Sequence, residues 1–379
     1  MQHQGRGGDG RLRDLPELRL LEVRLSGPRA CIALALLLAF AWPEVALARK
    51  NAAPAPPELV RWVAPWHEGV ALRYAAEDYD ISIGEGGRER SRTTGIETIR
   101  ITGVLDDGFV QTWSFDDSRY EQLEGGDGQE ALMRQLLESL PDLVLEVELD
   151  ATGNFSALRN LDQLAAQLGP ALRTGFEAAL QSGVEAAGGW PAGADGEAAR
   201  ARGREAAADM VARMTRPEVP GALMSRDALA YNDLFGAELE AGVPFGVDVE
   251  IDSPLGAGKV PARVTLLMQA GAAGSDEATL DWTTRMDRER AAEVALAAVE
   301  QLHGRQVTGE DREKVVADMS IVDAGHARFR RSTGVPLMLE TLRTVRAAGE
   351  QRVERRRMRL LDDAHGHEWP DDAPPQPAG

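Results

Sequence analysis

Two stretches of the chain alternate apolar and acidic residues for six positions each. They are Leu145–Asp150 (LEVELD) and Val247–Asp252 (VDVEID). Because successive side chains of a strand point to opposite faces of a sheet, the pattern predicts two half-buried strands, each with three acids on one face. Such acids lie about 6.5–7 Å apart, too far for neighbours to hold one small cation. We therefore interpret these faces as solvated surface, in preference to a metal site or a catalytic carboxylate pair.

Strand patterns dominate the first half of the chain. Asp107-Gly108 lies between two alternating segments and predicts a hairpin turn, since this dipeptide tolerates a positive φ angle. A short helix is predicted at Gln129–Leu140. The strands expected before LEVELD are Val70–Ala75, Tyr79–Ile83, Ile96–Leu105 and Phe109–Phe115.

The middle of the chain has helical periodicity. Apolar residues recur at three- and four-residue steps from Leu161 to Leu180, which predicts an amphipathic helix with a bend at Gly169-Pro170. A Gly/Ala-rich break follows at 183–196. Two more helices are predicted at Glu197–Met214 and Gly221–Phe235.

Strand patterns return in the last third of the chain. The expected strands are Val243–Ile251, Val260–Gln269 and Thr279–Met286, followed by helices at Arg288–Leu302 and Gly309–Met319. The chain then predicts an antiparallel meander of Ser320–Phe329, Val335–Arg346 and Gln351–Leu361. Its last segment is rich in Arg and Met, which favour helices, so a helix is the alternative there.

Runs of strands with helices collected between them predict an α+β fold. We expect antiparallel, curved, half-barrel-like sheets with amphipathic helices packed between or against them. The predicted organisation is a strand-rich half over 49–185, a Gly/Ala-rich break and helix over 186–217, and a second strand-rich half over 218–362. The matching acidic strands leave open a duplication that relates the two halves.

The two ends of the chain are expected to lie outside this fold. An apolar run, Ala30–Trp42, follows arginines and precedes Ala46-Leu47-Ala48, the pattern of a secretory signal cleaved after residue 48. We predict a signal peptide over 1–48, with a possible mis-assigned start. Cleavage removes the only cysteine, Cys31, and the Ala-, Gly- and Arg-rich composition favours a bacterial periplasm. The proline-rich end, 363–379, is predicted to be disordered.

Charge is distributed unevenly along the chain. The net charge of −19 argues against nucleic-acid binding. Within Arg328–Arg359, however, there are ten arginines and three acids. If the last segment is a strand, Arg355, Arg357 and Arg359 share one face and form an arginine ladder, which we expect to pair partly with the acidic strands. If the ladder is unpaired, the candidate contacts for a ligand are Arg343, Arg355, Arg357 and Arg359.

Catalytic motifs are weak or missing in the sequence. Gly256–Val260 resembles the end of a phosphate-binding loop but lacks the magnesium-binding hydroxyl, so we predict a hairpin loop. No Gly-x-Ser-x-Gly occurs. His365 and His367 lie in the proline-rich tail, which offers no rigid metal site. Trp62 and Trp66 are expected to pin the first segment to the body, with a sugar-stacking platform as the alternative. We expect no metal and no cofactor.

The plan of the chain resembles the bacterial lipoprotein carrier family, in which exported half-barrels follow a signal peptide. The resemblance is one of plan, so no functional residue is carried over from it. The chain is also similar to a family of exported proteobacterial proteins, which implies no activity. The shared landmarks are Tyr231–Gly236, Ser253–Gly256 and Ser332–Pro336.

These observations favour a non-catalytic periplasmic protein that binds an envelope protein, or an amphipathic or anionic ligand, on a curved sheet. No stable membrane anchor is expected. The alternative is a hydrolase that acts on envelope material. An apolar groove would favour the binding protein, whereas a cleft with a carboxylate pair or a Ser/His pair would favour the hydrolase.

Overall fold

The computed structural model describes most of the chain between residues 58 and 361. The described residues are 58–84, 87–125, 133, 137, 143–167, 169, 170, 174, 193–214, 218–252, 258–303 and 307–361. The predicted signal peptide and the proline-rich tail lie outside them, as does the helix predicted at 129–140 except for residues 133 and 137. Of the helix predicted at 161–180, residues 161–167 are described and are helical.

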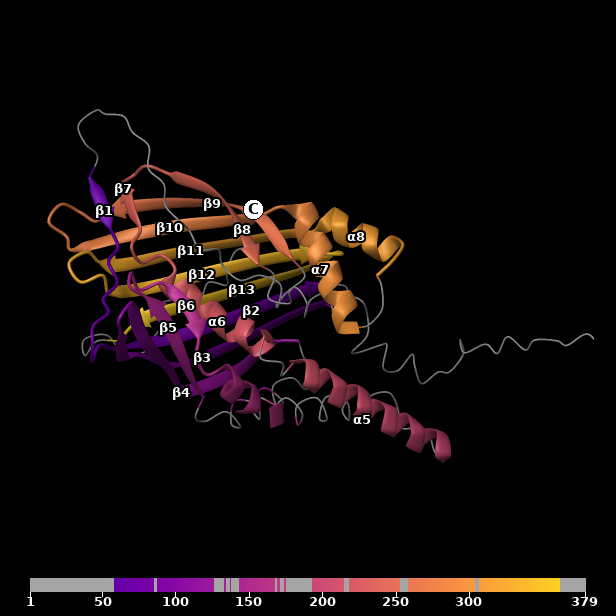
Figure 1. Cartoon of the computed structure of the whole chain (residues 1–379). Helices are drawn as coiled ribbons and strands as arrows, with labels where there is room; N and C mark the ends of the chain where they lie inside the picture. The colour runs from indigo at the N-terminus through magenta and orange to yellow at the C-terminus, as the bar shows by residue number, and fades with distance from the viewer. Residues whose placement is uncertain are drawn as a thin grey trace, which may run out of the picture.

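An open, eleven-stranded antiparallel sheet organises the chain (Figure 1). Its strand order is β6-β5-β4-β3-β2-β13-β12-β11-β10-β9-β8, and its edge strands β6 and β8 do not pair with each other. A second, two-stranded sheet pairs β1 with β7. The strands are β1 Leu59–Arg61, β2 Ala71–Gly84, β3 Gly87–Leu105, β4 Gly108–Glu124, β5 Val144–Asp150, β6 Phe155–Leu158, β7 Glu238–Glu240, β8 Phe245–Asp252, β9 Lys259–Ala270, β10 Glu277–Met286, β11 Ser320–Arg330, β12 Pro336–Ala347 and β13 Glu350–Leu360.

Helices are few in the described part of the chain, so the antiparallel sheet is supported more firmly than the α+β class. They are α5 Ala194–Met214, α6 Glu218–Asn232, α7 Arg288–His303 and α8 Glu310–Asp318. In Figure 1, α6 lies against one face of the sheet, and α7 and α8 lie toward one end of the strands.

The predicted strands are confirmed, and several are longer than predicted. Two predicted strands, Val70–Ala75 and Tyr79–Ile83, are parts of the single strand β2. The meander β11-β12-β13 is antiparallel, so the helical alternative for its last segment is wrong. Because β13 also pairs with β2, the two strand-rich halves of the chain join in one sheet.

The hairpin β3–β4 is confirmed, but its glycine has another role than the one predicted. Gly108 does not have a positive φ angle. A Cβ atom at this position would instead lie 1.9 Å from the carbonyl oxygen of Leu149 on β5. The glycine is therefore needed because two backbones approach each other closely.

One apolar core lies between the sheet and α6. It contains Leu145 of β5 and Leu266 of β9, which lie near opposite edges of the sheet, together with Tyr231 of α6. In Figure 1, β5 and β6 near one edge of the sheet and β8 at the other lie forward on the side of α6, and we call this face concave. A second core lies at the other end of the strands, where Val260 and Val345 pack with α7 and α8.

Two of the proposed landmarks lie together against the first segment of the chain. The Trp62 ring stacks on Phe329 at 4.4 Å, and its Nε1 donates a hydrogen bond to the Gly334 carbonyl. Gly236 donates from its backbone N–H to the carbonyl of Trp62 at 2.6 Å. Trp62 is 1% exposed. The tryptophan therefore pins this segment to the body, as predicted, and cannot serve as a sugar platform.

We expect Gly108→Ala to lower the free energy of unfolding by about 2 kcal/mol or more, because the new methyl group would overlap a strand carbonyl. Gly103→Ala in the same hairpin is the matched control, since its Cβ would meet only the Val110 side chain, at 3.4 Å. Urea unfolding of both variants measures the difference, and equal stabilities would contradict the close approach.

Candidate functional site

A band of charged side chains crosses the concave face between the two apolar cores. On β12 the order along this face is Leu339 in the first core, Arg343 in the band and Val345 in the second core. We call this band the charged belt. Its described members are Asp78, Asp80, Glu97, Arg226, Asp227, Asp323, Arg343, Arg352, Glu354 and Arg356.

Strand register places most of these charges opposite one another. Arg356 on β13 is directly opposite Asp78 on β2, and its Nη1 lies 2.9 and 2.8 Å from the two carboxylate oxygens. The same guanidinium donates to Glu97 on β3 and lies 3.4 Å from Asp227 on α6. Arg356 and Glu97 are buried, whereas Asp78 and Asp227 keep part of their side-chain surface exposed, so this one buried cation serves three carboxylates.

Helix α6 adds a second arginine to the belt. Arg226 Nη1 donates to Glu354 Oε2 at 2.7 Å. Glu354 also lies 3.0 Å from Arg352, which in turn donates to Asp80. Burial would raise the pKa of Glu354, but the neighbouring arginines together lower it.

Other carboxylates of the belt are less well compensated. Burial raises the pKa of Asp78, of Asp80 and of Asp323, and in each case a nearby arginine only partly opposes the shift. Burial raises the pKa of Glu97 to about 7, against the opposing effect of Arg356. Its Oε2 atom is buried without a hydrogen-bond partner among the described residues. The belt thus holds more negative charge than its arginines neutralise.

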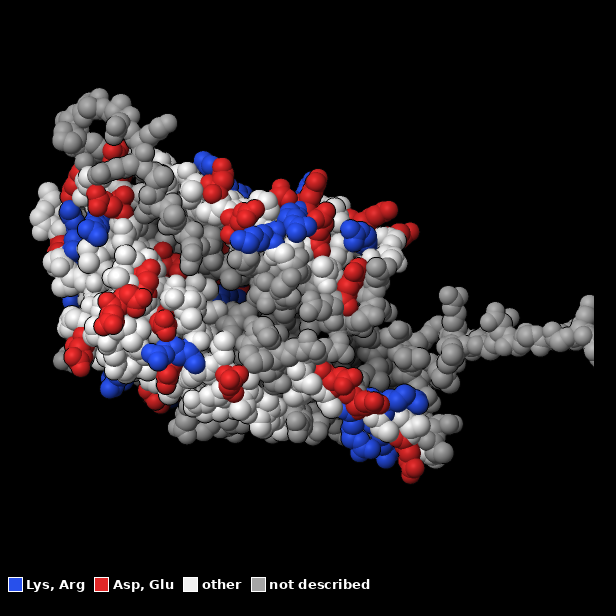
Figure 2. Space-filling view, in the orientation of Figure 1, with Lys and Arg blue, Asp and Glu red and all other residues white. Residues whose placement is uncertain are grey.

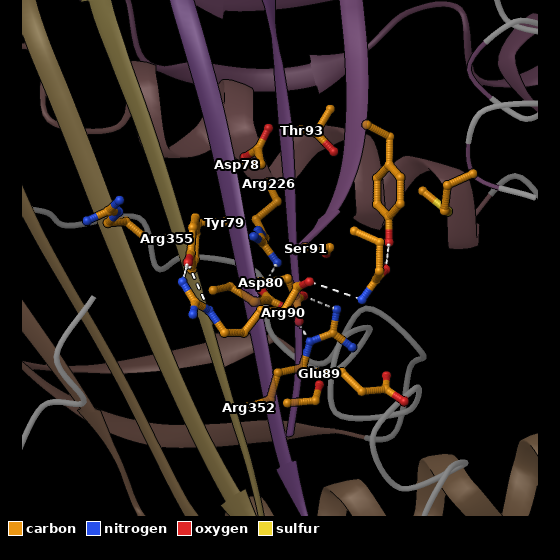
Figure 3. Close-up of a pocket in the computed structure, with 15 residues that line it drawn as sticks. Asp78, Tyr79, Asp80, Glu89, Arg90, Ser91, Thr93, Arg226, Arg352 and Arg355 are labelled. Carbon is orange, nitrogen blue, oxygen red and sulfur yellow. Dashed lines mark hydrogen bonds and ion pairs between the residues drawn. The ribbon is translucent and has the colours of Figure 1, made fainter. Parts of the chain in front are cut away.

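A cavity of about 440 Å³ opens beside the belt (Figure 3). Arg226, Arg352 and Glu354 contribute to its wall together with hydroxyl-bearing strand residues. In Figure 3, Arg226 lies next to Asp80 and Arg352, with Tyr79 and Arg355 to the left of them. Figure 2 shows the molecule from the same side as Figure 1, with acidic and basic side chains spread over the described surface. The cavity is lined by Asp78, Tyr79, Asp80, Ser82, Glu89, Arg90, Ser91, Thr93, Tyr120, Gln122, Met133, Arg226, Arg352, Glu354 and Arg355.

The cavity wall offers unused hydrogen-bonding groups. Cross-strand register places Ser82 opposite Glu89, Ser91 opposite Asp80 and Thr93 opposite Asp78. The hydroxyls of Ser82, Ser91 and Thr93 have no hydrogen-bond partner among the described residues. Tyr120 instead donates to Gln122 at 2.5 Å. A bound polar molecule could therefore use these hydroxyls without breaking a bond of the protein.

The four arginines proposed as ligand contacts do not form one patch. Arg343 lies on the concave face, buried, 3.4 Å from Asp323. Arg355, Arg357 and Arg359 alternate with the belt residues of β13 and so point to the opposite face. Of the four, only Arg355 contributes to the wall of the cavity.

The arginine ladder is paired, but with other acids than those predicted. Arg357 donates to Glu77 of β2 at 2.5 Å, and Arg355 donates to the same oxygen at 3.3 Å. Glu77 is 1% exposed. The expected pairing with the acidic strands is wrong, because neither β5 nor β8 is a neighbour of β13.

The acidic strands face solvent, as predicted. Asp248 pairs with Arg263 at 2.9 Å, and the side chain of Asp248 is 79% exposed. Glu250 lies 3.9 Å from Lys259, and Glu148 lies 4.0 Å from Arg159. Each of these acids therefore lies near a basic residue that is close to it in the sequence.

Other candidate motifs contribute no recognisable chemistry. Lys259 is the first residue of β9 and pairs with Asp252 at the end of the antiparallel strand β8, as the hairpin prediction requires. His326 Nδ1 lies 2.7 Å from Asp281 on the opposite face of the sheet from the belt. Among the described residues, no group of three or more His, Cys, Asp or Glu side chains is placed to hold a metal ion. His365 and His367 lie outside the described residues.

Comparisons with known proteins leave the family open. No protein-family model matches the chain, and no curated protein matches it. A solved structure entitled "Lipid-protein interactions in lipovitellin" is similar at 10% identity and a TM-score of 0.38. The alignment covers 78% of this chain but 25% of that chain. At this TM-score the similarity assigns neither a fold family nor a function. Among the described residues, no helix is long and apolar enough to span a membrane.

We expect Arg357→Glu to lower the free energy of unfolding by roughly 3–5 kcal/mol, because it leaves Glu77 buried beside a second carboxylate. Arg263→Glu makes the same change at an exposed pair and should alter stability by less than about 1 kcal/mol. Chemical unfolding measures both values. Equal effects would mean that Glu77 and Arg357 are not a buried pair.

The raised pKa of Glu97 predicts how stability changes with pH. In the unfolded chain this carboxyl releases its proton near 4.5, and in the folded chain near 7. The folded chain holds more protons between these values, so the free energy of unfolding should decrease as pH rises through this window, by up to about 3 kcal/mol.

Glu97→Gln removes this titration while keeping an oxygen that accepts from Arg356. We expect the stability of the unmodified protein, measured relative to the variant by urea unfolding, to decrease from pH 5 to pH 8. Parallel pH profiles for the two proteins would show that Glu97 titrates in its ordinary range.

Proposed function

We propose that this chain is a non-catalytic periplasmic binding protein that holds a small polar molecule in the cavity beside the charged belt. The observation that carries the proposal is the cavity itself: about 440 Å³, with three hydroxyls that have no partner among the described residues, beside a fixed array of charges. This volume lies within the roughly 300–1,000 Å³ of small-molecule sites. A fixed polar wall suits binding because its groups need little reorganisation.

A polar ligand fits this face better than an amphipathic one. The apolar part of the concave face packs against α6 and the segment after it, where Tyr74, Trp113 and Tyr231 are each 1% exposed or less. Tyr74 and Tyr231 are joined by a hydrogen bond of 2.7 Å between their hydroxyls. An acyl chain would have to displace this packing, whereas a polar molecule enters the cavity without doing so.

The periplasmic location rests on the sequence. The apolar run at Ala30–Trp42 is followed by the small-x-small triplet Ala46-Leu47-Ala48, which is typical of signal-peptidase cleavage. Cys31 is the only cysteine and precedes that site, so the exported chain would be stable without disulfides.

An envelope-acting hydrolase is the second candidate, and one observation favours it. Asp78 and Asp80 both line the cavity, and burial raises the pKa of each. A carboxyl with a raised pKa can donate a proton to a leaving group. Both residues are held by arginines, however, and both serve the β2–β13 pairing, so binding without turnover is the favoured reading.

Filling the cavity tests the proposal. Ser91→Trp places a large ring among the lining residues, and Thr265→Trp makes a comparable change at an exposed position of β9. The probes are glucose, glucosamine, N-acetylglucosamine, glycine and inorganic phosphate at millimolar concentration, assayed by thermal shift and calorimetry.

We expect at least one probe to raise the melting temperature of the unmodified protein and of Thr265→Trp, but not of Ser91→Trp. Binding that survives in Ser91→Trp would place the site elsewhere, and the absence of binding by all five probes would reject a small polar ligand. Release of hydrolysis products from an oligosaccharide that contains these sugars would favour the hydrolase over the binding protein.

A further inference from the structure

We infer that the ligand of the cavity is a small organic cation that also carries hydroxyl groups, such as an amino sugar. The inference rests on the proposed function and adds the charge class of the ligand. It comes from the balance of charges around the cavity and from the kind of hydrogen-bonding groups that remain available there.

Carboxylates outnumber guanidiniums in the charged belt. The ten described members comprise six acids and four arginines, a formal balance of −2. The shortage is greatest at Arg356, which Asp78, Glu97 and Asp227 share. In a partly desolvated site, such an excess attracts a compensating positive charge.

The wall of the cavity contains four acids and four arginines, but only two of the arginines lie on the same face of the sheet as the acids. On the concave face, Asp78, Asp80, Glu89 and Glu354 face two arginines, Arg226 and Arg352. Asp78 and Asp80 remain accessible there, with side chains 45% and 30% exposed. The arginines that pair with these two carboxylates also pair with other acids, so a bound cation could approach both carboxylates.

Two further arginines of the cavity wall are committed to an aromatic ring. Arg90 Nε donates to the Tyr79 hydroxyl at 3.0 Å, and its guanidinium carbon lies 5.6 Å from the ring centre. The guanidinium of Arg355 lies 5.5 Å from the same ring and also contacts Glu77. These cations are held against Tyr79 and Glu77 instead of balancing Asp78 and Asp80.

The available groups also suit an ammonium group better than an anion. An ammonium donates three hydrogen bonds, and carboxylate oxygens and the hydroxyls of Ser82, Ser91 and Thr93 can all accept them. An anion could accept hydrogen bonds from the same hydroxyls, but it would lie beside the carboxylates of Asp78 and Asp80, and Arg226 and Arg352 already donate to Glu354 and Asp80. A neutral sugar could use the hydroxyls but would leave the charge excess unchanged.

Proton binding would compete with a cation at these carboxylates. Burial raises the pKa of Asp78 and of Asp80. A bound cation would favour their charged forms, so protons and ligand compete. Affinity for a cation should therefore fall as pH is lowered toward the acidic range, whereas affinity for a neutral sugar should not.

Matched sugars provide the test. Glucosamine differs from glucose in one substituent, an ammonium in place of a hydroxyl, and glucose 6-phosphate carries the opposite charge. In calorimetry at low salt, we expect glucosamine to bind at least about tenfold more tightly than either. Tighter binding of glucose or of the phosphate, abolished by Ser91→Trp, would overturn the cation and leave the polar binding site intact. No binding of any of the three sugars would overturn the amino sugar, whereas the proposed function would fall only if none of the five probes named above binds.

A charge reversal outside the ion-pair network checks the electrostatic cause. Glu89 is exposed and lines the cavity, so Glu89→Arg changes its local charge without removing a partner of a belt arginine. We expect it to weaken glucosamine binding by about tenfold. Glu313→Arg on α8, also at an exposed residue, makes the same change in net charge and should have little effect. Equal losses would attribute binding to the overall charge of the chain and contradict a cation site in the cavity.

Discussion

The burial of Arg356 among three carboxylates is the constraint on which the arrangement of this chain depends. A guanidinium away from water must be paired, and its partners come from β2, β3 and α6. This requirement fixes the register of the last strand against the first long one, since a slip by one residue would turn Arg356 to the opposite face. It also explains why the concave face is polar at its centre and apolar on both sides.

The same constraint couples segments that are far apart in sequence. β13 joins the two strand-rich halves, and α6, from between them, contributes Arg226 and Asp227. Buried ion pairs add little net stability over apolar packing, but loss of one partner leaves a buried charge that costs several kcal/mol. We therefore infer that the belt specifies how the two halves and α6 pack together, and that this arrangement leaves a residual negative charge. That charge lies at the cavity, which connects the packing of the sheet to the proposed ligand.

The strands could be predicted from the sequence because their pattern is local. Period-two alternation located β5 and β8, and even the ambiguous β13 alternates well enough to be assigned. The site could not be predicted in the same way. Arg352, Glu354 and Arg356 lie between the residues of the arginine ladder, and a strand charged on both faces gives no sign of which face is inside. The partners of these arginines could not be predicted either. The Glu77–Arg357 and Asp78–Arg356 pairs join residues about 280 positions apart in the sequence. The position of Arg226 depends on the packing of a helix that has no strong apolar stripe.

A carbon-13 NMR titration of the Asp and Glu carboxyl groups tests the central claim most directly. With assignments from Asp78→Asn and Glu97→Gln, the account predicts that Glu97 titrates near pH 7 and that Asp78 titrates above the ordinary range of aspartate. Both groups should shift to lower pKa when a cation occupies the cavity. If both titrate at ordinary values in the folded protein, the carboxylates of the belt are fully compensated, and neither the residual negative charge nor the cationic ligand would stand.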